Sequence, residues 1–267
     1  ARAERNQKDP THRSRLYSAA MTTIQTIGVL GAGQMGGGIA QVAATAGYDV
    51  RLCDATLELA KKGLAKIDAI LDKQVQKGKL EAGAKSAITG RIAPIGSPAD
   101  FRGCDLVIEA ATENLDLKLK LFKQCDEALG KEGFLASNTS SISLTKLAGS
   151  TSRPERVVGL HFMNPPPLMK LVELVRAVQT SDETCAVAKS VAEKMGKTVV
   201  TSKDAPGFLV NRMLIPMLCE AIFTLEQGLG TPEDIADNKR SYTGKFLREV
   251  MDRRPAKAKR PARQAAE

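Results

Sequence analysis

Two titratable side chains could act together in proton transfer. His161 ends a strand-like segment, 157–162, and the only other histidine is His12. Glu173 lies in an apolar stretch, 171–175. A neutral imidazole can accept the proton of a hydroxyl group, and a carboxylate can orient the ring and stabilise the imidazolium that forms. The simpler interpretation is a hydrogen-bonded core histidine and a solvent-facing acid on an edge strand.

A glycine-rich turn early in the chain predicts a phosphate-binding loop. Segment 31–36 reads Gly-Ala-Gly-Gln-Met-Gly, follows a strand-like run and opens a helix-like one. These glycines allow a tight turn and close approach of a pyrophosphate, which the helix N-terminus meets with free N–H groups. Asp54 ends the second predicted strand, where an acid binds the ribose hydroxyls of NAD and repels the 2′-phosphate of NADP. A plain tight turn is the alternative. A base together with a nicotinamide site is the minimum requirement of an alcohol dehydrogenase.

Three further polar features could contact a substrate. Ser137 ends another predicted strand and could reach a substrate oxygen, although a helix N-cap in a polar turn is the simpler interpretation. Asn211 lies on an otherwise apolar helix and, if buried, needs a partner, either a ligand oxygen or a backbone carbonyl. The helical stretch 57–79 is rich in lysine. Such a face is usually only solvated, but this one could meet a phosphate-bearing group such as coenzyme A.

Alternating strand-like and helix-like segments must position these side chains. The predicted strands are 24–30, 48–53, 92–95, 105–110, 133–137, 157–162, 170–176 and 197–201. Between the early strands lie amphipathic stretches of helical length at 34–46, 57–78, 81–90 and 114–129. This pattern predicts an α/β fold with a Rossmann-type, doubly wound, mainly parallel sheet. The link between 157–162 and 170–176 is too short for a helical crossover, so these strands should run antiparallel at the sheet edge.

The sequence changes character at Pro206-Gly207. Residues 208–225 are apolar almost all round, as expected of a helix buried on several sides. The expected organisation is a disordered extension at 1–20, an NAD-binding domain at 21–204, the start of an incomplete α-helical C-terminal domain at 205–237, and a disordered basic tail at 238–267.

Composition and charge exclude several classes of protein. Among 267 residues, no apolar run approaches the roughly 20 residues that a membrane helix requires. The net charge of +9 sits in the two ends, because 1–20 carry five Lys or Arg against two acids and 238–267 carry ten against three. The nearly neutral remainder argues against a specific nucleic-acid partner. Five widely spaced cysteines without a CxxC pair predict reduced thiols in a cytoplasmic protein, with no metal site.

Taken together, these segments resemble the L-3-hydroxyacyl-CoA dehydrogenase family over about 22–236. The matching segments are 31–36, Asp54, Glu113-Asn114 with Lys118, 137–141, 161–166, 169–173, and Pro206-Gly207-Phe208 with Asn211-Arg212. The resemblance implies a Rossmann fold, NAD as cofactor and an acyl-CoA as substrate. The implied reaction is the reversible oxidation of an L-3-hydroxyacyl-CoA, such as 3-hydroxybutyryl-CoA, to the 3-ketoacyl-CoA.

The resemblance also implies roles for individual residues. His161 would be the general acid and base, and Glu173 would be its partner. Ser137 and Asn211 would bind the reacting oxygens of the substrate, and the lysine-bearing helices after the second strand would meet coenzyme A. The residues implied to bind NAD are Gly31, Gly33, Gln34, Met35, Gly36, Asp54, Glu113, Lys118 and Asn164.

The chain departs from the family pattern at its C-terminus. The family continues past 233–235 into helices that complete the second domain and form a homodimer. Here a basic, proline-containing sequence follows, which we interpret as a truncation or a frameshift. This departure predicts a weak homodimer and reduced activity. Two other functions stay open, a dehydrogenase of a free hydroxy acid or sugar acid, and a dinucleotide-binding protein that has lost turnover.

Overall fold

The computed structural model describes residues 23–253. Both the expected extension at 1–20 and the last part of the basic tail, 254–267, lie outside these residues. The chain divides into two compact units, with Asn211 the last residue of the first and Arg212 the first residue of the second. Each unit is described by itself below.

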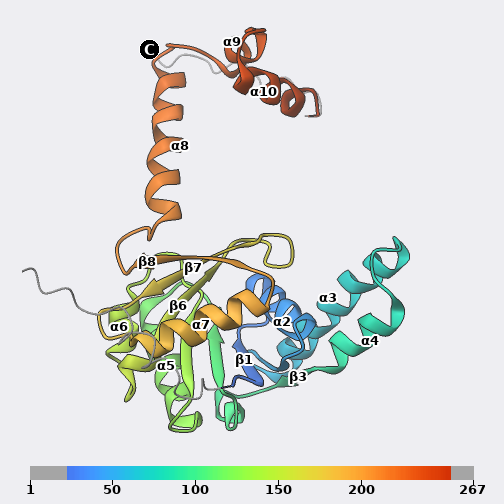
Figure 1. The fold of residues 1–267 in the computed structure, drawn as a ribbon, viewed down its shortest axis with the longest axis vertical. Coiled ribbons are helices and arrows are strands. Elements are labelled where there is room, and N and C mark those ends of the chain that lie inside the picture. Colours follow the sequence, from blue (N-terminus) through green and yellow to red (C-terminus); the bar gives the residue numbers. More distant parts are fainter. Residues whose placement is uncertain (1–22, 254–267) are drawn as a thin grey trace, which may run out of the picture. The chain divides into compact units, whose positions relative to one another are not determined.

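The first unit is built on one sheet with the strand order β3-β2-β1-β4-β5-β6-β7-β8 (Figure 1). All neighbouring strands pair in parallel except β6 and β7, which are antiparallel. The strands are β1 (Thr26–Leu30), β2 (Asp49–Cys53), β3 (Ile92–Ile95), β4 (Leu106–Glu109), β5 (Phe134–Ser137), β6 (Val157–Phe162), β7 (Leu171–Arg176) and β8 (Thr198–Lys203). Helices connect the parallel strands, and a helical region follows the last strand. The predicted Rossmann-type fold class is therefore confirmed.

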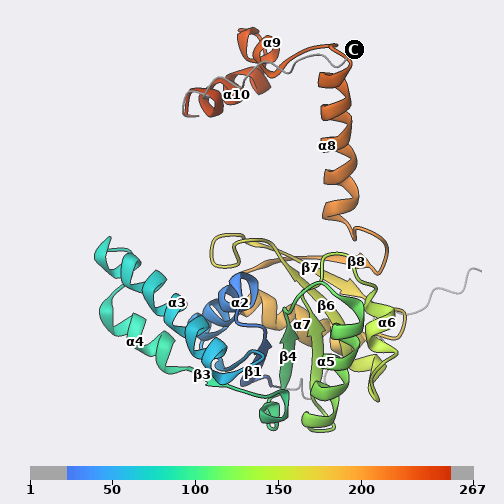
Figure 2. The ribbon, with the colours of Figure 1, turned by 180° about the vertical axis from the view of Figure 1, so that it is seen from behind.

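The central strands are apolar throughout because helices cover both faces of the sheet. Along β4, Leu106 and Ile108 pack into a core with α2, α3 and α7, whereas Val107 packs into a second core with α5 and α6. Figure 1 shows α7 on one side of the sheet, and Figure 2 shows α5 on the opposite side. The helices of this unit are α2 (Gln34–Thr45), α3 (Leu57–Gln76), α4 (Ala82–Gly90), α5 (Leu115–Ala128), α6 (Leu144–Ala148) and α7 (Asp182–Lys194), with 3-10 turns η2 (Pro98–Phe101) and η3 (Pro154–Arg156).

The antiparallel pairing of β6 and β7 is confirmed, but this pair does not form the sheet edge. β8 pairs with β7 on its outer side and is itself the edge strand. The parallel return to β8 requires a crossover helix, and α7 provides it. Neither α7 nor the short α6 was among the predicted helices. The hydroxyl of Ser181 caps α7 by accepting a hydrogen bond from the Thr184 N–H at 3.1 Å.

Strand direction brings the candidate chemistry to one edge of the sheet. The carboxyl ends of β1, β2, β4, β5 and β6 lie side by side because these strands are parallel. The glycine turn, Asp54, the loop after β4, the serine motif and His161 all stand at or just beyond those ends. In doubly wound folds this edge is where ligands bind.

The second unit is helical. It holds most of α8 (Val210–Glu226), followed by α9 (Pro232–Asp237) and α10 (Tyr242–Asp252). The sequence predicted that α8 would be buried on several sides, but it buries none of its residues within the described chain. The packing contacts of this unit join α9 to α10 instead.

Helix α10 lies where the sequence analysis expected a disordered tail from 238 onwards. Two local signals explain the helix. Ser241 caps it by accepting a hydrogen bond from the Gly244 N–H at 2.9 Å, and apolar residues recur at helical spacing at Tyr242, Phe246 and Val250. The basic residues within the helix, Lys245 and Arg248, and those that flank it on both sides obscure the apolar period.

Candidate active site

The paired strands β6 and β7 bring His161 and Glu173 directly opposite each other. The Nδ1 atom of His161 lies 2.7 Å from Oε2 of Glu173, and the Glu173 side chain is fully buried. A carboxylate only accepts hydrogen bonds, so Nδ1 carries the proton and donates it. In the neutral imidazole the opposite ring nitrogen, Nε2, is then the one without a proton and able to accept one.

The second oxygen of Glu173 holds the start of α8. Its Oε1 atom accepts hydrogen bonds from the N–H groups of Leu209 at 2.9 Å and Val210 at 2.8 Å. A carboxylate at this position is favoured by the positive end of the helix dipole. The Phe208 ring also meets the His161 ring edge-on, with centroids 5.8 Å apart. Glu173 therefore fixes both the imidazole and the helix turn that carries Asn211.

His161 lines a cavity of about 430 Å³ at the carboxyl edge of the sheet. The structure brings six predicted site residues together here. Two polar residues that the sequence analysis did not assign to the site, Asn138 and Ser140, also line it. The complete lining is Met35, Ala110, Ala111, Glu113, Lys118, Asn138, Ser140, His161, Phe162, Met163, Asn164 and Asn211.

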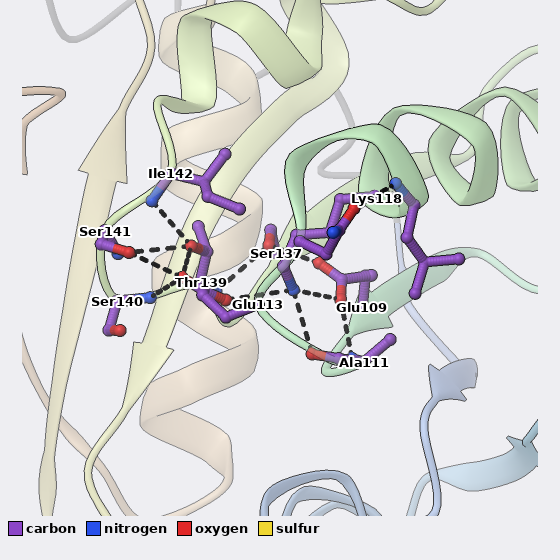
Figure 3. A network of polar contacts seen from close by, with 11 residues as sticks. Glu109, Ala111, Glu113, Lys118, Ser137, Thr139, Ser140, Ser141 and Ile142 are labelled. Atoms are coloured by element: carbon purple, nitrogen blue, oxygen red, sulfur yellow. Dashed lines mark hydrogen bonds and ion pairs between the residues drawn. The ribbon is translucent and has the colours of Figure 1, made fainter.

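Ser137 is not among the residues that line this cavity. Its side chain is fully buried, and its hydroxyl donates a hydrogen bond to Oε2 of Glu109 at 2.6 Å (Figure 3). The hydroxyl oxygen of Ser137 also accepts a hydrogen bond from the Thr139 N–H at 3.1 Å. Ser137 is the last residue of β5 and pairs with Glu109 at the end of β4. The two buried side chains therefore contact each other, and Ser137 does not belong to the loop that follows the strand. Ser140, in that loop, lines the cavity in its place.

Glu109 is the centre of a buried polar network that the sequence analysis missed. Its Oε1 atom accepts hydrogen bonds from the Lys118 Nζ at 2.5 Å and from the Ala111 N–H at 2.7 Å. Lys118 also donates to the carbonyl of Ala111 at 3.2 Å. Glu109 and Lys118 are both almost fully buried. The signal in the sequence was an acid at the end of an otherwise apolar strand, which must find a partner if it is buried.

Glu113 extends this network toward the serine motif (Figure 3). Its carboxylate accepts hydrogen bonds from the hydroxyl of Thr139, the N–H of Ser140 at 3.1 Å and the hydroxyl of Ser141 at 3.0 Å. Partial burial raises the pKa of Glu113, but the hydrogen bond from Thr139 and the charge of Lys118, 3.4 Å away, outweigh this and lower it. Glu113 is therefore an anion at neutral pH.

The glycine turn forms a cradle that fits a dinucleotide. Gly31 has a φ of 104°, which favours glycine, and a Cβ atom on Gly36 would lie 1.7 Å from the Gly31 carbonyl oxygen. Gly31, Gly33 and Asp54 line a second cavity of about 440 Å³, which shares Ala110 and Ala111 with the first. Asp54 accepts the N–H of Ala32 at 2.7 Å and so holds this turn in place.

A third cavity, of about 430 Å³, lies between α2, α3 and the proline-rich loop after β6. It shares Gly33 with the second cavity. Its lining is largely apolar and includes Gln34 and one of the lysines of α3, Lys66. The Gln34 side-chain amide donates a hydrogen bond to the Asn164 side chain at 3.1 Å, where this cavity approaches the first one. Shared residues thus connect the three cavities.

Two features are absent from residues 23–253. No helix there combines the length and the apolar character that crossing a bilayer requires. Nor does this part of the chain hold a group of three or more His, Cys, Asp or Glu side chains that could bind a metal ion.

Comparison with known proteins gives two adjoining family matches. Residues 26–205 match the NAD-binding domain of 3-hydroxyacyl-CoA dehydrogenase, and residues 207–244 match its C-terminal domain. A 3-hydroxybutyryl-CoA dehydrogenase of Bradyrhizobium diazoefficiens is 49% identical over 212 residues, which are 79% of this chain and 72% of that one. A probable 3-hydroxybutyryl-CoA dehydrogenase of Deinococcus radiodurans is 50% identical over 208 residues, 78% of this chain and 74% of that one.

Solved structures agree with these matches. The crystal structure of (S)-3-hydroxybutyryl-CoA dehydrogenase from Ralstonia eutropha superposes with a TM-score of 0.77 at 47% identity, covering 80% of this chain and 75% of that chain. As the sequence predicted, the chain belongs to the 3-hydroxyacyl-CoA dehydrogenase family of NAD-binding oxidoreductases.

Proposed function

We propose that this protein catalyses the reversible, NAD-dependent oxidation of L-3-hydroxyacyl-CoA to 3-ketoacyl-CoA, with 3-hydroxybutyryl-CoA as its substrate. Relatives with 45–50% identity carry the name of that activity. One observation carries the proposal. A buried histidine–carboxylate pair, 2.7 Å apart, lines a cavity that shares two residues, Ala110 and Ala111, with the cavity at the glycine turn.

The proton is handled by this chain's own residues. Nε2 of His161 accepts the proton of the substrate hydroxyl, while Nδ1–H stays hydrogen-bonded to Glu173. The negative charge of Glu173 stabilises the imidazolium that forms. Bound NAD⁺ would supply the acceptor for the hydride of the substrate carbon that carries the hydroxyl group. In the reverse direction the imidazolium returns its proton to the oxygen of the ketone.

The remaining residues of the first cavity bind and orient. Ser140 and Asn211 are proposed to donate hydrogen bonds to the substrate oxygens, with Ser140 in the role that the sequence analysis gave to Ser137. Glu113, Lys118 and Asn164 are proposed to line the nicotinamide side, and Gly31, Gly33, Gly36 and Asp54 to hold the adenosine and pyrophosphate part. Met35 also lines the first cavity and is proposed to contact the cofactor there.

The third cavity suits the coenzyme A part of the substrate. Its apolar walls fit the pantetheine arm, and Lys66 offers a positive charge to a phosphate. Gln34 of this cavity is hydrogen-bonded to Asn164 of the first cavity, which supports a substrate whose acyl end extends toward His161. A homodimer and a cytoplasmic location stay predictions, to be checked by sedimentation and by fractionation of the source cells.

A second candidate is the oxidation or reduction of a small molecule that carries no coenzyme A. Two structures with 29–31% identity favour it, because one is named as a dehydrogenase of a pyridine carboxylic acid and the other as a diketoreductase. Their TM-scores are 0.69 and 0.74. The same His161–Glu173 pair would serve either substrate class, so the third cavity is the feature that separates them.

The test is NADH oxidation by the purified protein with acetoacetyl-CoA, compared with free acetoacetate. We expect turnover with the thioester only, and His161→Ala should lower kcat by about 1000-fold or more while NADH affinity stays within about twofold. Equal rates with free acetoacetate would favour the second candidate. NADH binding without turnover of either compound would identify a dinucleotide-binding protein that has lost its activity.

A further inference from the structure

Three charged side chains of unequal burial stand at one end of the first cavity. Glu109 and Lys118 form an ion pair of 2.5 Å, and their side chains are only 3% and 1% exposed. Lys118 lies 3.4 Å from Glu113, whose side chain is 38% exposed. The group therefore contains two carboxylates and one ammonium group. Of its three members, Glu113 and Lys118 line the cavity.

Glu109 has the contacts of a carboxylate paired with an ammonium group. Its Oε1 atom meets the donors of Lys118 and of the Ala111 N–H, and its Oε2 atom meets the Ser137 hydroxyl. Lys118 is the cationic partner of this pair, at 2.5 Å. Glu113 also accepts from three donors of the serine motif. The charge of the group is thus one unit negative.

The buried position of Glu109 decides which charge the cavity experiences. Because Glu109 and Glu113 share the single cation Lys118, the group keeps one negative charge in excess, and Glu113 exposes it at the cavity wall. We propose that Glu109 is a specificity-determining residue that keeps the nicotinamide end of the cavity negative and so favours the oxidised over the reduced coenzyme. This rests on the proposed function, which places the nicotinamide in this cavity. The oxidised ring is a cation and the reduced ring is neutral, so only the oxidised form gains from the charge.

The test uses Glu109→Gln, which keeps the shape of the side chain and removes its charge. The dissociation constant of NADH is measured by fluorescence, and that of NAD⁺ by competition with NADH. The ratio of the NAD⁺ to the NADH constant should rise roughly tenfold, the effect of one unit charge over a distance on the order of 10 Å at an effective dielectric constant of about 20.

Two matched variants separate charge from structure. Ser137→Ala removes a hydrogen bond to Glu109 but leaves its charge, so the ratio should stay as in the wild type even if the protein is less stable. Glu127→Gln makes the same change of charge at an exposed position near the end of α5, and it too should leave the ratio unchanged. If Glu109→Gln does not fold, Glu113→Gln removes the same unit of charge and should shift the ratio in the same direction.

The inference is overturned if folded Glu109→Gln, or Glu113→Gln in its place, changes both dissociation constants by the same factor or changes neither of them, because the network would then be only structural. It is overturned also if Ser137→Ala shifts the ratio as much as Glu109→Gln. Failure of the wild-type protein to bind either coenzyme refutes the proposed function itself, which distinguishes the two failures.

Discussion

Ser137 and Ser140 differ by three positions, and alanine at each should affect different properties of the protein. Ser137→Ala removes the donor to Oε2 of Glu109 at 2.6 Å and the acceptor of the Thr139 N–H at 3.1 Å. The first is a hydrogen bond to a charged group, worth about 1.5–3 kcal/mol, and the second is worth about 1 kcal/mol. The free energy of unfolding should therefore fall by about 2–4 kcal/mol.

Ser140→Ala should leave stability within about 0.5 kcal/mol, since this residue stands in a loop at the cavity wall. In Figure 3 its side chain points away from Glu109. Loss of one hydrogen-bond donor to the reacting oxygen should lower kcat/KM for acetoacetyl-CoA on the order of 100-fold. The Ser137 variant, where it is folded, should keep kcat/KM within about fivefold of the wild type, because β5 still positions the loop that carries Ser140.

The assay is urea denaturation followed by circular dichroism, together with steady-state oxidation of NADH. The reasoning is refuted if Ser137→Ala unfolds at the wild-type urea concentration yet loses turnover, because Ser137 would then contact the substrate. It is refuted equally if Ser140→Ala retains full activity with acetoacetyl-CoA.

Two further predictions concern the glycine turn and a helix cap. Gly36→Ala should abolish NADH binding and lower the free energy of unfolding by about 3 kcal/mol or more, because its Cβ would lie 1.7 Å from the Gly31 carbonyl oxygen. Gly37→Ala on the same helix should bind NADH normally, because the nearest atom to its Cβ would be 3.8 Å away. Equal NADH affinities of the two variants in fluorescence titration would contradict this. Asp204 caps α6, and although partial burial raises its pKa, hydrogen bonds from this helix turn outweigh that and lower it. Its contribution is present above the ordinary pKa of about 4 and is lost as pH falls through the lowered value. Asp204→Asn should therefore cost about 1 kcal/mol at pH 7, and the difference in urea midpoint should shrink toward pH 3; a constant difference would argue against the cap.

Local sequence patterns were sufficient to predict most of the sheet. Short apolar runs bounded by polar or glycine residues predicted every strand to within a few residues, and the short link after Phe162 predicted the single antiparallel pair. The outer position of β8 was not predictable in this way, because it depends on where the α7 crossover returns. Helix α10 had a cap and an apolar period in the sequence, but its basic residues concealed them.

The candidate site was harder to predict, since adjacent residues in a motif have different surroundings. Whether Ser137 or Ser140 faces the cavity depends on where β5 ends and on its register with β4, which places Ser137 beside Glu109. Glu109 itself reads as one acid in an apolar strand, and only folding brings Lys118 of α5 to it. The pairing of His161 with Glu173, by contrast, follows from two strands that a short link forces together.

The β6–β7 pairing ties chemistry to core packing through a single alignment. The register that sets His161 opposite Glu173 also sets Leu160 opposite Leu174, and those leucines point to the other face, into the hydrophobic core. A slip by one residue would turn every side chain of the moved strand over. A slip that separated His161 from Glu173 would also move Leu160 or Leu174 out of the hydrophobic core. The burial of these leucines therefore stabilises the register that pairs the histidine with its carboxylate. Loop 163–170 lies outside this alignment, and it is constrained instead by the lining that it gives to the first and third cavities.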